Sequence, residues 1–108
     1  MSKSLTVLPQ RRSRVPAAAA KDYAALFRAL GDETRLAIVG LLAAADEPLC
    51  VCEIEPRFDL SQPTISHHLR LLREAGVVTS ERRGTWVYDA LDPERLEGLR
   101  EFHARLTR

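Results

Sequence analysis

The most regular hydrophobic pattern in the chain lies between residues 61 and 76. Ile65, Leu69 and Leu72 recur at helical spacing and define one apolar side of a helix. The opposite side carries hydrogen-bonding and cationic side chains, namely Ser66, His67, Arg70 and Arg73. The pattern therefore predicts an amphipathic helix that packs by one side and presents the other, an arrangement typical of helices that read DNA.

Three residues set the limits of this helix. Ser61 stands at the N-cap position, Pro63 falls in the first turn, where its missing N–H costs little, and Gly76 supplies a left-handed stop. The two neighbouring histidines fall on different sides of the helix. We therefore expect His67 to contact a DNA groove and His68 to be a packed, hydrogen-bonded side chain.

Three further helices and one short element are predicted. One helix follows Pro16 and ends at Gly31, a second is capped by Asp32, a short element limited by Pro56 covers about residues 50–58, and a last helix opens at Asp92. The second helix is apolar around most of its circumference, so we expect it at the centre of the domain. Apolar stripes in the first and last helices comprise Tyr23, Leu26, Phe27, Leu30, and Leu96, Leu99, Phe102, His103, Leu106.

Two β-rich runs at residues 77–79 and 85–88 flank Arg82, Arg83 and Gly84, and this predicts a β-hairpin. Because the hairpin follows the amphipathic helix, its arginines are candidates for DNA phosphate or minor-groove contacts; elsewhere they would be solvated turn residues. The predicted fold is mainly α with a small β-hairpin wing (α+β), in the order α-α-α-α-β-β-α, a winged helix-turn-helix.

Length and composition narrow the function classes. The 108 residues allow one small domain with a single core but little room for an enclosed substrate cleft, which disfavours an enzyme. The chain has no run of eighteen apolar residues and no secretory segment at its start, so we expect a soluble, cytoplasmic protein. Two apolar stripes are more than so small a domain buries. A second copy of the chain would cover them, and the expected partner is therefore an identical chain in a homodimer.

Charge divides the chain unevenly. Five basic residues precede Asp22, the first acidic residue, and give this segment a charge of +5. Because the net charge of the chain is +1, the remaining residues carry a charge of −4. Residues 1–16 are predicted to form a mobile basic arm, and residues 17–108 the winged-helix domain for DNA binding and dimerisation. Two roles are open for this arm: it is a solvated tail, or it contacts the phosphates or the minor groove of DNA.

Cys50 and Cys52 lie at the start of the short element before the predicted reading helix. Thiolates are soft donors, so the pair would select thiophilic species such as As(III), Sb(III), Cu(I), Cd(II) or Zn(II). Two packed apolar residues and a thiol-oxidation switch are the alternatives. A zinc or cadmium site needs more donors, for which Glu53, Glu55 and His103 are candidates.

The segments ALGDETRLAIVGLL, LCVCEIE, SQPTISHHLRLLREAGVV and RRGTWVYDAL resemble the ArsR/SmtB family of bacterial metal- and metalloid-responsive repressors. The resemblance covers about residues 23–106. It implies a dimeric winged helix whose operator is an inverted repeat of double-stranded DNA. The dimer needs no cofactor to bind this operator, and it releases the DNA when an inducer binds. By this resemblance the major groove is contacted by Ser61, Gln62, Thr64, Ser66, His67 and Arg70, and the inducer by Cys50 and Cys52.

The chain departs from the family pattern at two places. Arsenic-responsive members carry a third cysteine where this chain has Glu55, so a third position on arsenite would be filled by a small thiol, by hydroxide or not at all. A methylated arsenical has two exchangeable positions and suits two cysteines. Pro93, Glu94 and Arg95 occupy the opening positions of the family's last-helix metal site, which disfavours a zinc sensor of that kind. We expect His103 to be a packed interface residue.

Two functions of other classes remain open. A winged helix can serve as a protein-interaction module, with the cysteines purely structural. A redox enzyme would use the thiol pair, but the chain has no βαβ pattern or cofactor loop.

Overall fold

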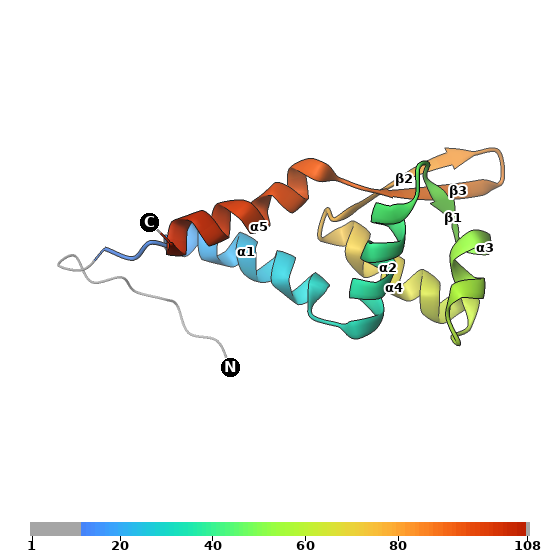
Figure 1. Cartoon of the computed structure of the whole chain (residues 1–108), viewed down its shortest axis with the longest axis horizontal. Coiled ribbons are helices and arrows are strands. Elements are labelled where there is room, and N and C mark those ends of the chain that lie inside the picture. Colours follow the sequence, from blue (N-terminus) through green and yellow to red (C-terminus); the bar gives the residue numbers. More distant parts are fainter. Residues whose placement is uncertain (1–11, 108) are drawn as a thin grey trace.

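The computed structural model describes residues 12–107, and so most of the predicted basic arm, residues 1–11, lies outside the described residues. The elements in chain order are α1 (Ala17–Leu30), α2 (Glu33–Ala44), β1 (Leu49–Cys50), α3 (Val51–Ile54), the 3-10 helix η1 (Glu55–Arg57), α4 (Gln62–Glu74), β2 (Val78–Arg83), β3 (Trp86–Leu91) and α5 (Pro93–Leu106). Figure 1 shows α1 and α5 side by side at one end of the molecule, while α2, α3 and α4 gather beside the sheet at the other. The predicted winged helix-turn-helix is confirmed.

The sheet has three antiparallel strands in the order β1-β3-β2. β2 and β3 form the predicted hairpin, and Gly84, with a φ of 66°, supplies the left-handed residue of its two-residue turn. β1 was not predicted. It pairs Leu49 with Asp89 and Cys50 with Tyr88, and thereby attaches the first cysteine to the hairpin.

The core forms where α2 and α4 meet α1, α3 and the sheet. Ile65, Leu69 and Leu72, the three residues of the predicted apolar side, are completely buried. Ile38 and Leu42 place α2 in this core, but Leu36 on the same helix is 53% exposed. α2 therefore contributes to the core, as its central position requires, but the side that carries Leu36 is exposed in the single chain.

The predicted helix limits are confirmed by the caps. Ser61 Oγ accepts a hydrogen bond from the Thr64 N–H (3.3 Å), and Asp92 Oδ1 accepts one from the Glu94 N–H (3.0 Å). Asp32 caps α2 by accepting from the Arg35 N–H (3.0 Å), which lowers the pKa of the Asp32 carboxyl, with smaller contributions from the charges of Arg35 and His68. Gly76 has a φ of 80° and stops α4.

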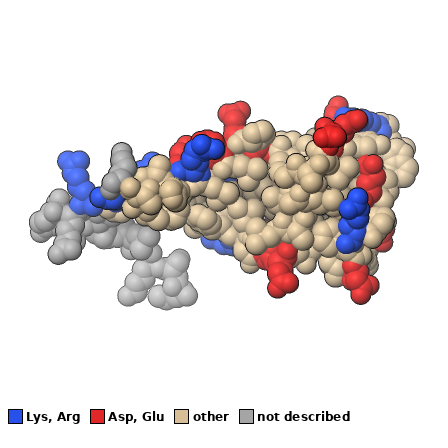
Figure 2. All heavy atoms as spheres, in the orientation of Figure 1, with Lys and Arg blue, Asp and Glu red and all other residues tan. Residues whose placement is uncertain are grey.

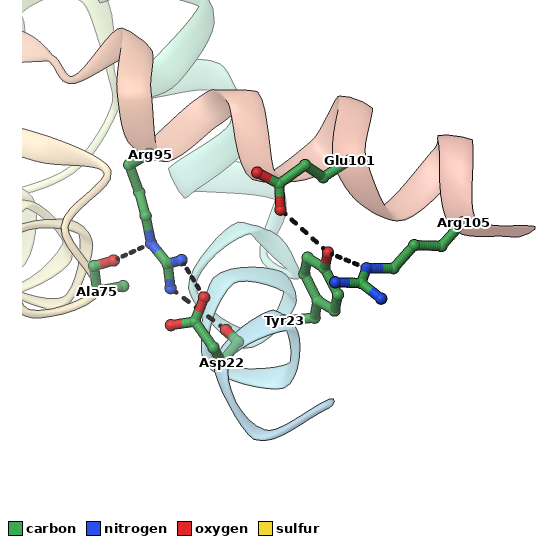
Figure 3. A network of polar contacts seen from close by, with 6 residues as sticks. All are labelled: Asp22, Tyr23, Ala75, Arg95, Glu101 and Arg105. Atoms are coloured by element: carbon green, nitrogen blue, oxygen red, sulfur yellow. Dashed lines mark hydrogen bonds and ion pairs between the residues drawn. The ribbon is translucent and has the colours of Figure 1, made fainter. Parts of the chain in front are cut away.

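A polar network ties α5 to α1 and to the end of α4 (Figure 3). Arg95 donates from Nε to the carbonyl oxygen of Ala75 (2.7 Å) and from Nη1 to Asp22 Oδ2 (2.8 Å). Nearer the C-terminal end of α5, the Tyr23 hydroxyl donates to Glu101 Oε1 (3.2 Å) and accepts from Arg105 Nε (2.8 Å). The long C-terminal helix is thus held by bonds from both of its ends to the body of the domain.

Candidate nucleic-acid interface and cysteine site

The outward side of α4 carries the side chains that the sequence assigns to DNA. Ser61, Gln62, His67 and Arg70 are exposed, and Thr64 and Ser66 are partly exposed. Arg70 donates from Nη2 to His67 Nδ1 (2.9 Å) and from Nη1 to Glu74 Oε2 (3.3 Å), so the two residues share one patch of surface. Their contact with a DNA groove stays a prediction.

His68 lies on the other side of α4, as expected. Its side chain is 15% exposed, and Arg35 Nη1 lies 3.3 Å from its Nδ1. Since a guanidinium only donates, this contact makes Nδ1 the acceptor nitrogen of the ring. The expectation of a packed, hydrogen-bonded histidine is confirmed.

The wing presents its two arginines in different ways. Both Arg82 and Arg83 are exposed at the tip of β2. Arg83 donates to Glu81 Oε1 (3.0 Å) and lies 4.6 Å from the centre of the Tyr88 ring. Being adjacent in a strand, the two side chains point to opposite faces of the hairpin.

Cys50 and Cys52 stand at the junction of β1 and α3. Cys50 is 3% exposed and ends β1, whereas Cys52 is exposed in the first turn of α3. A disulfide joins them, with Cα atoms 5.3 Å apart. Glu53 Oε1 accepts from the backbone N–H of Cys50 (3.0 Å) and thereby fixes the backbone of the first cysteine. The two sulfurs are close enough for one atom to bridge them once the bond is reduced.

A surface groove of about 970 Å³ connects the cysteines with the reading helix. Its walls are the start of α3 with Cys50 and Cys52, the outward side of α4 with Ser66, His67 and Arg70, and strand β3 of the wing with Trp86, Val87 and Asp89. Residues that the sequence assigns separately to DNA and to an inducer therefore share one groove. The wing tip arginines do not line it.

Asp89 is the residue of this groove that sequence reasoning missed. It is 1% exposed, and its Oδ1 accepts a hydrogen bond from Ser80 Oγ on the neighbouring strand. Its Oδ2 is buried and has no hydrogen-bond partner among residues 12–107. The available signal was the alternation in β3: Val87, Asp89 and Leu91 share a face, so an acid occupies an inward position between two apolar residues.

The C-terminal helix offers no comparable cluster. Arg95 is hydrogen-bonded to Ala75 and Asp22, and His103 is exposed in the single chain. Among residues 12–107, no group of three or more His, Cys, Asp or Glu side chains is arranged to hold a metal ion. Acidic and basic side chains are distributed around the edge of the molecule in Figure 2, and the middle of this face is largely uncharged.

Comparison with known proteins identifies the family. The model of the bacterial regulatory protein arsR family matches residues 32–80, which run from the cap of α2 through α4 into β2. The arsenical resistance operon repressor of Bacillus subtilis (strain 168) is 37% identical over 79 residues, which span 73% of this chain and 74% of that protein. The chain belongs to the ArsR family.

Other ArsR-family proteins agree with this assignment. The arsenical resistance operon repressor of Escherichia coli (strain K12) is 52% identical over 68 residues, 63% of this chain; the match spans little more than half, 57%, of that repressor. The homodimeric winged helix-turn-helix DNA-binding domain of a possible ArsR-family regulator from Mycobacterium bovis superposes with a TM-score of 0.68 at 27% identity. The match covers 87% of this chain and 88% of that one. Within residues 12–107, none of the helices is of a length and apolarity that would span a bilayer.

Proposed function

We propose that this protein is a cytoplasmic transcriptional repressor that releases its operator when a thiophilic metalloid binds reduced Cys50 and Cys52. Trivalent arsenic or antimony is the leading inducer class, including methylated arsenic. The observation that carries the proposal is the groove that is lined both by the cysteine pair and by the outward side of α4. The arsenical resistance repressors among the relatives support the same inducer class.

In this proposal the outward side of α4 enters the major groove of DNA. Ser61, Gln62, Thr64, Ser66, His67 and Arg70 contact base edges and phosphates there, because hydroxyl, amide and guanidinium groups match the hydrogen-bonding edges of the bases. Arg82 and Arg83 in the wing contact the backbone or the minor groove. The helix is well suited to this role, since its apolar side is completely buried and its orientation is fixed by the core.

The functional unit is a homodimer that binds an inverted repeat. Phe27 and Leu106, on α1 and α5, are 40% and 50% exposed in the single chain, and Phe27 stacks edge-on against Phe102 with ring centres 4.9 Å apart. A second copy would bury this surface, and the homodimeric Mycobacterium bovis relative supports such an assembly. His103 on the same helix would then lie at or near the interface.

Release follows from the shared groove. A metalloid that bridges the two sulfurs fixes the start of α3, which packs against α4, and it occupies space beside Ser66 and His67. Both effects oppose the DNA-bound position of α4. Loss of contacts that are each worth about 1–3 kcal/mol in both protomers is sufficient to empty an operator.

Two other signals act on the same pair of sulfurs. A Cys50–Cys52 disulfide is present in this structure, and it supports thiol oxidation as a second candidate signal. Zinc, cadmium or copper is the other candidate class. Zinc and cadmium prefer four donors, and the described residues provide no cluster of three, so the metalloid is favoured over these ions.

The experiment is a titration of reduced protein on a fluorescent DNA fragment from upstream of its own gene, followed by anisotropy. Arsenite and antimonite should release the wild-type protein from DNA, whereas Cys50→Ser combined with Cys52→Ser should bind DNA equally well and stay bound. High salt should release both proteins and serves as the control for reversible binding. Release of the double variant by arsenite, or no preference for this DNA over an unrelated duplex, would contradict the proposal.

A further inference from the structure

Three side chains on the outward side of α4 form a hydrogen-bonded chain. Arg70 donates from Nη2 to His67 Nδ1 (2.9 Å), one turn before it, and from Nη1 to Glu74 Oε2 (3.3 Å), one turn after it. Spacings of three and four residues bring all three side chains to the same side of the helix. The guanidinium group is therefore held by a partner on each side.

The ion pair with Glu74 changes what Arg70 offers to DNA. The side chains of Arg70 and Glu74 are 55% and 61% exposed, so the pair faces solvent on the surface assigned to DNA. A carboxylate beside the guanidinium offsets its positive charge and is itself repelled by phosphates. Within the described residues, Arg73 on the same outward side has no ion-pair partner. Arg73 is therefore the better phosphate ligand of the two, and the charge of Arg70 is used in part within the protein.

The bond to Arg70 determines which nitrogen of His67 carries the proton. A guanidinium only donates hydrogen bonds, so Nδ1 is the unprotonated acceptor. In the neutral ring the proton is then on Nε2, and that nitrogen is a donor. Within residues 12–107 no other side chain is bonded to the His67 ring. His67 therefore presents a donor, and no acceptor, to a molecule that lies against α4.

A side chain that only donates distinguishes between bases in the major groove. Guanine offers two adjacent acceptors there, O6 and N7, whereas adenine has an amino group beside its N7 and cytosine presents an amino group. Thymine has one acceptor, next to a methyl group. A lone N–H donor is therefore matched best by guanine and worst by cytosine.

On the basis of the repressor function proposed above, we infer that His67 selects a guanine in each half of the operator and that Arg70 is the residue that positions His67. Arg70 holds Nδ1 as the acceptor, and Nε2–H donates to O6 or N7 of guanine. Glu74 supports the arrangement by holding Arg70 from its other side. The remaining N–H groups of Arg70 can still contact DNA.

The test measures base preference rather than affinity alone. The reduced full-length protein is titrated on fluorescent duplexes of the DNA upstream of its own gene, and binding is followed by anisotropy. The salt concentration is fixed, and the pH is about 8, where imidazole rings are neutral. Each base pair of the bound region is replaced in turn by the other three, symmetrically in both half-sites. The quantity that decides is the ratio of the dissociation constants of the replaced and the original duplex at each position.

His67→Ala should lose the preference at one position of the half-site, where the wild type requires guanine. Replacement of this guanine by cytosine should weaken binding of the wild type roughly five- to a hundredfold, and that of His67→Ala by less than about twofold. His67→Gln should move the preference at this position from guanine to adenine, because an amide donates to N7 and accepts from the N6 amino group at once. A new preference cannot result from a loss of folding.

Arg70 is tested at the position that His67→Ala identifies. Arg70→Ala should reduce the cytosine-to-guanine ratio there to less than about threefold, because the ring is no longer held. Arg73→Ala is the matched control on the same helix: it should weaken binding to every duplex by a similar factor and keep the wild-type ratio. Glu74→Gln removes the carboxylate that offsets the charge of Arg70, so binding to an unrelated duplex should tighten by roughly two- to fivefold.

The outcomes separate this inference from the proposed function. If the wild type has no preference for this DNA over an unrelated duplex, the proposed function fails and this inference fails with it. If the wild type selects this DNA but His67→Ala keeps every base preference, or the position that it identifies is not a guanine, this inference is overturned and the repressor function stands. If folded Arg70→Ala keeps the wild-type ratio, as Arg73→Ala does, Arg70 does not position His67 and this inference is overturned for Arg70.

Discussion

Arg95 offers the sharpest test of how α5 is attached to the rest of the domain. Its side chain is 18% exposed and donates to Ala75 at the end of α4 and to Asp22 on α1. A hydrogen bond from a charged donor to a partly buried carbonyl oxygen contributes about 1.5–3 kcal/mol, whereas an ion pair with a carboxylate as exposed as Asp22, at 66%, contributes about 1 kcal/mol or less. Arg95→Ala should therefore lower the free energy of unfolding by about 2–3 kcal/mol.

The magnitude can be divided with two further variants. Asp22→Ala removes only the exposed ion pair and should cost about 0.5 kcal/mol. Arg100→Ala is the matched control on the same helix, because Arg100 is 82% exposed and pairs with Glu97 one turn away. It should lie within about 0.5 kcal/mol of the wild type.

The assay is urea unfolding followed by far-ultraviolet circular dichroism, at one fixed protein concentration because a dimer gains apparent stability with concentration. In thermal unfolding, the loss in Arg95→Ala corresponds to a fall in Tm of roughly 10 °C or more for a domain of this size. If Arg95→Ala costs no more than Arg100→Ala, the bond to Ala75 does not stabilise the fold and the reasoning is refuted.

Two other predictions concern the core and the caps. Leu72→Ala removes a completely buried side chain on the packed side of α4 and should cost about 2–5 kcal/mol in the same unfolding assay; a cost below 1 kcal/mol would mean that α4 is not held by this core. Asp32→Asn keeps an N-cap acceptor but removes the charge. Because the folded pKa of Asp32 is lowered, its charge stabilises the fold above the unfolded pKa of about 3.8, and this contribution is lost as the pH falls through the folded value. The advantage of wild type over Asp32→Asn should be fully present well above the unfolded pKa of 3.8 and should shrink as the pH falls below it, and a difference that does not change with pH would contradict this explanation.

The elements that the sequence predicts correctly are those determined by local chemistry. Ile65, Leu69 and Leu72 repeat at the helical period, and Ser61 and Gly76 are chemically suited to the ends of the same helix, so pattern and caps agree on α4. The hairpin is equally local, since its two-residue turn needs a left-handed residue and Gly84 supplies it. Such features require no knowledge of the rest of the fold.

The features that the sequence does not predict depend on contacts between distant segments. β1 has two residues, too few for an alternating pattern, and it exists because β3 supplies its hydrogen-bonding partner nearly forty residues later. Leu36 reads as buried in an apolar helix, yet its exposure depends on which sides of α2 receive neighbours. Asp89 lies in a run that has the composition of an ordinary strand, and it is buried because β3 is the central strand, paired with Leu49 on one side and Ser80 on the other.

The pairing of β1 with β3 joins Cys50 and the wing in one stretch of hydrogen-bonded backbone. If operator occupancy and metalloid capture both bias the position of that stretch, each must weaken the other by the same factor, because linkage between two binding equilibria is reciprocal. The sensitivity of the protein to arsenic is then a property of the protein together with its DNA. Each added copy of the promoter would raise the dose needed for half-maximal induction, so plasmid-borne and chromosomal reporters should respond at different thresholds.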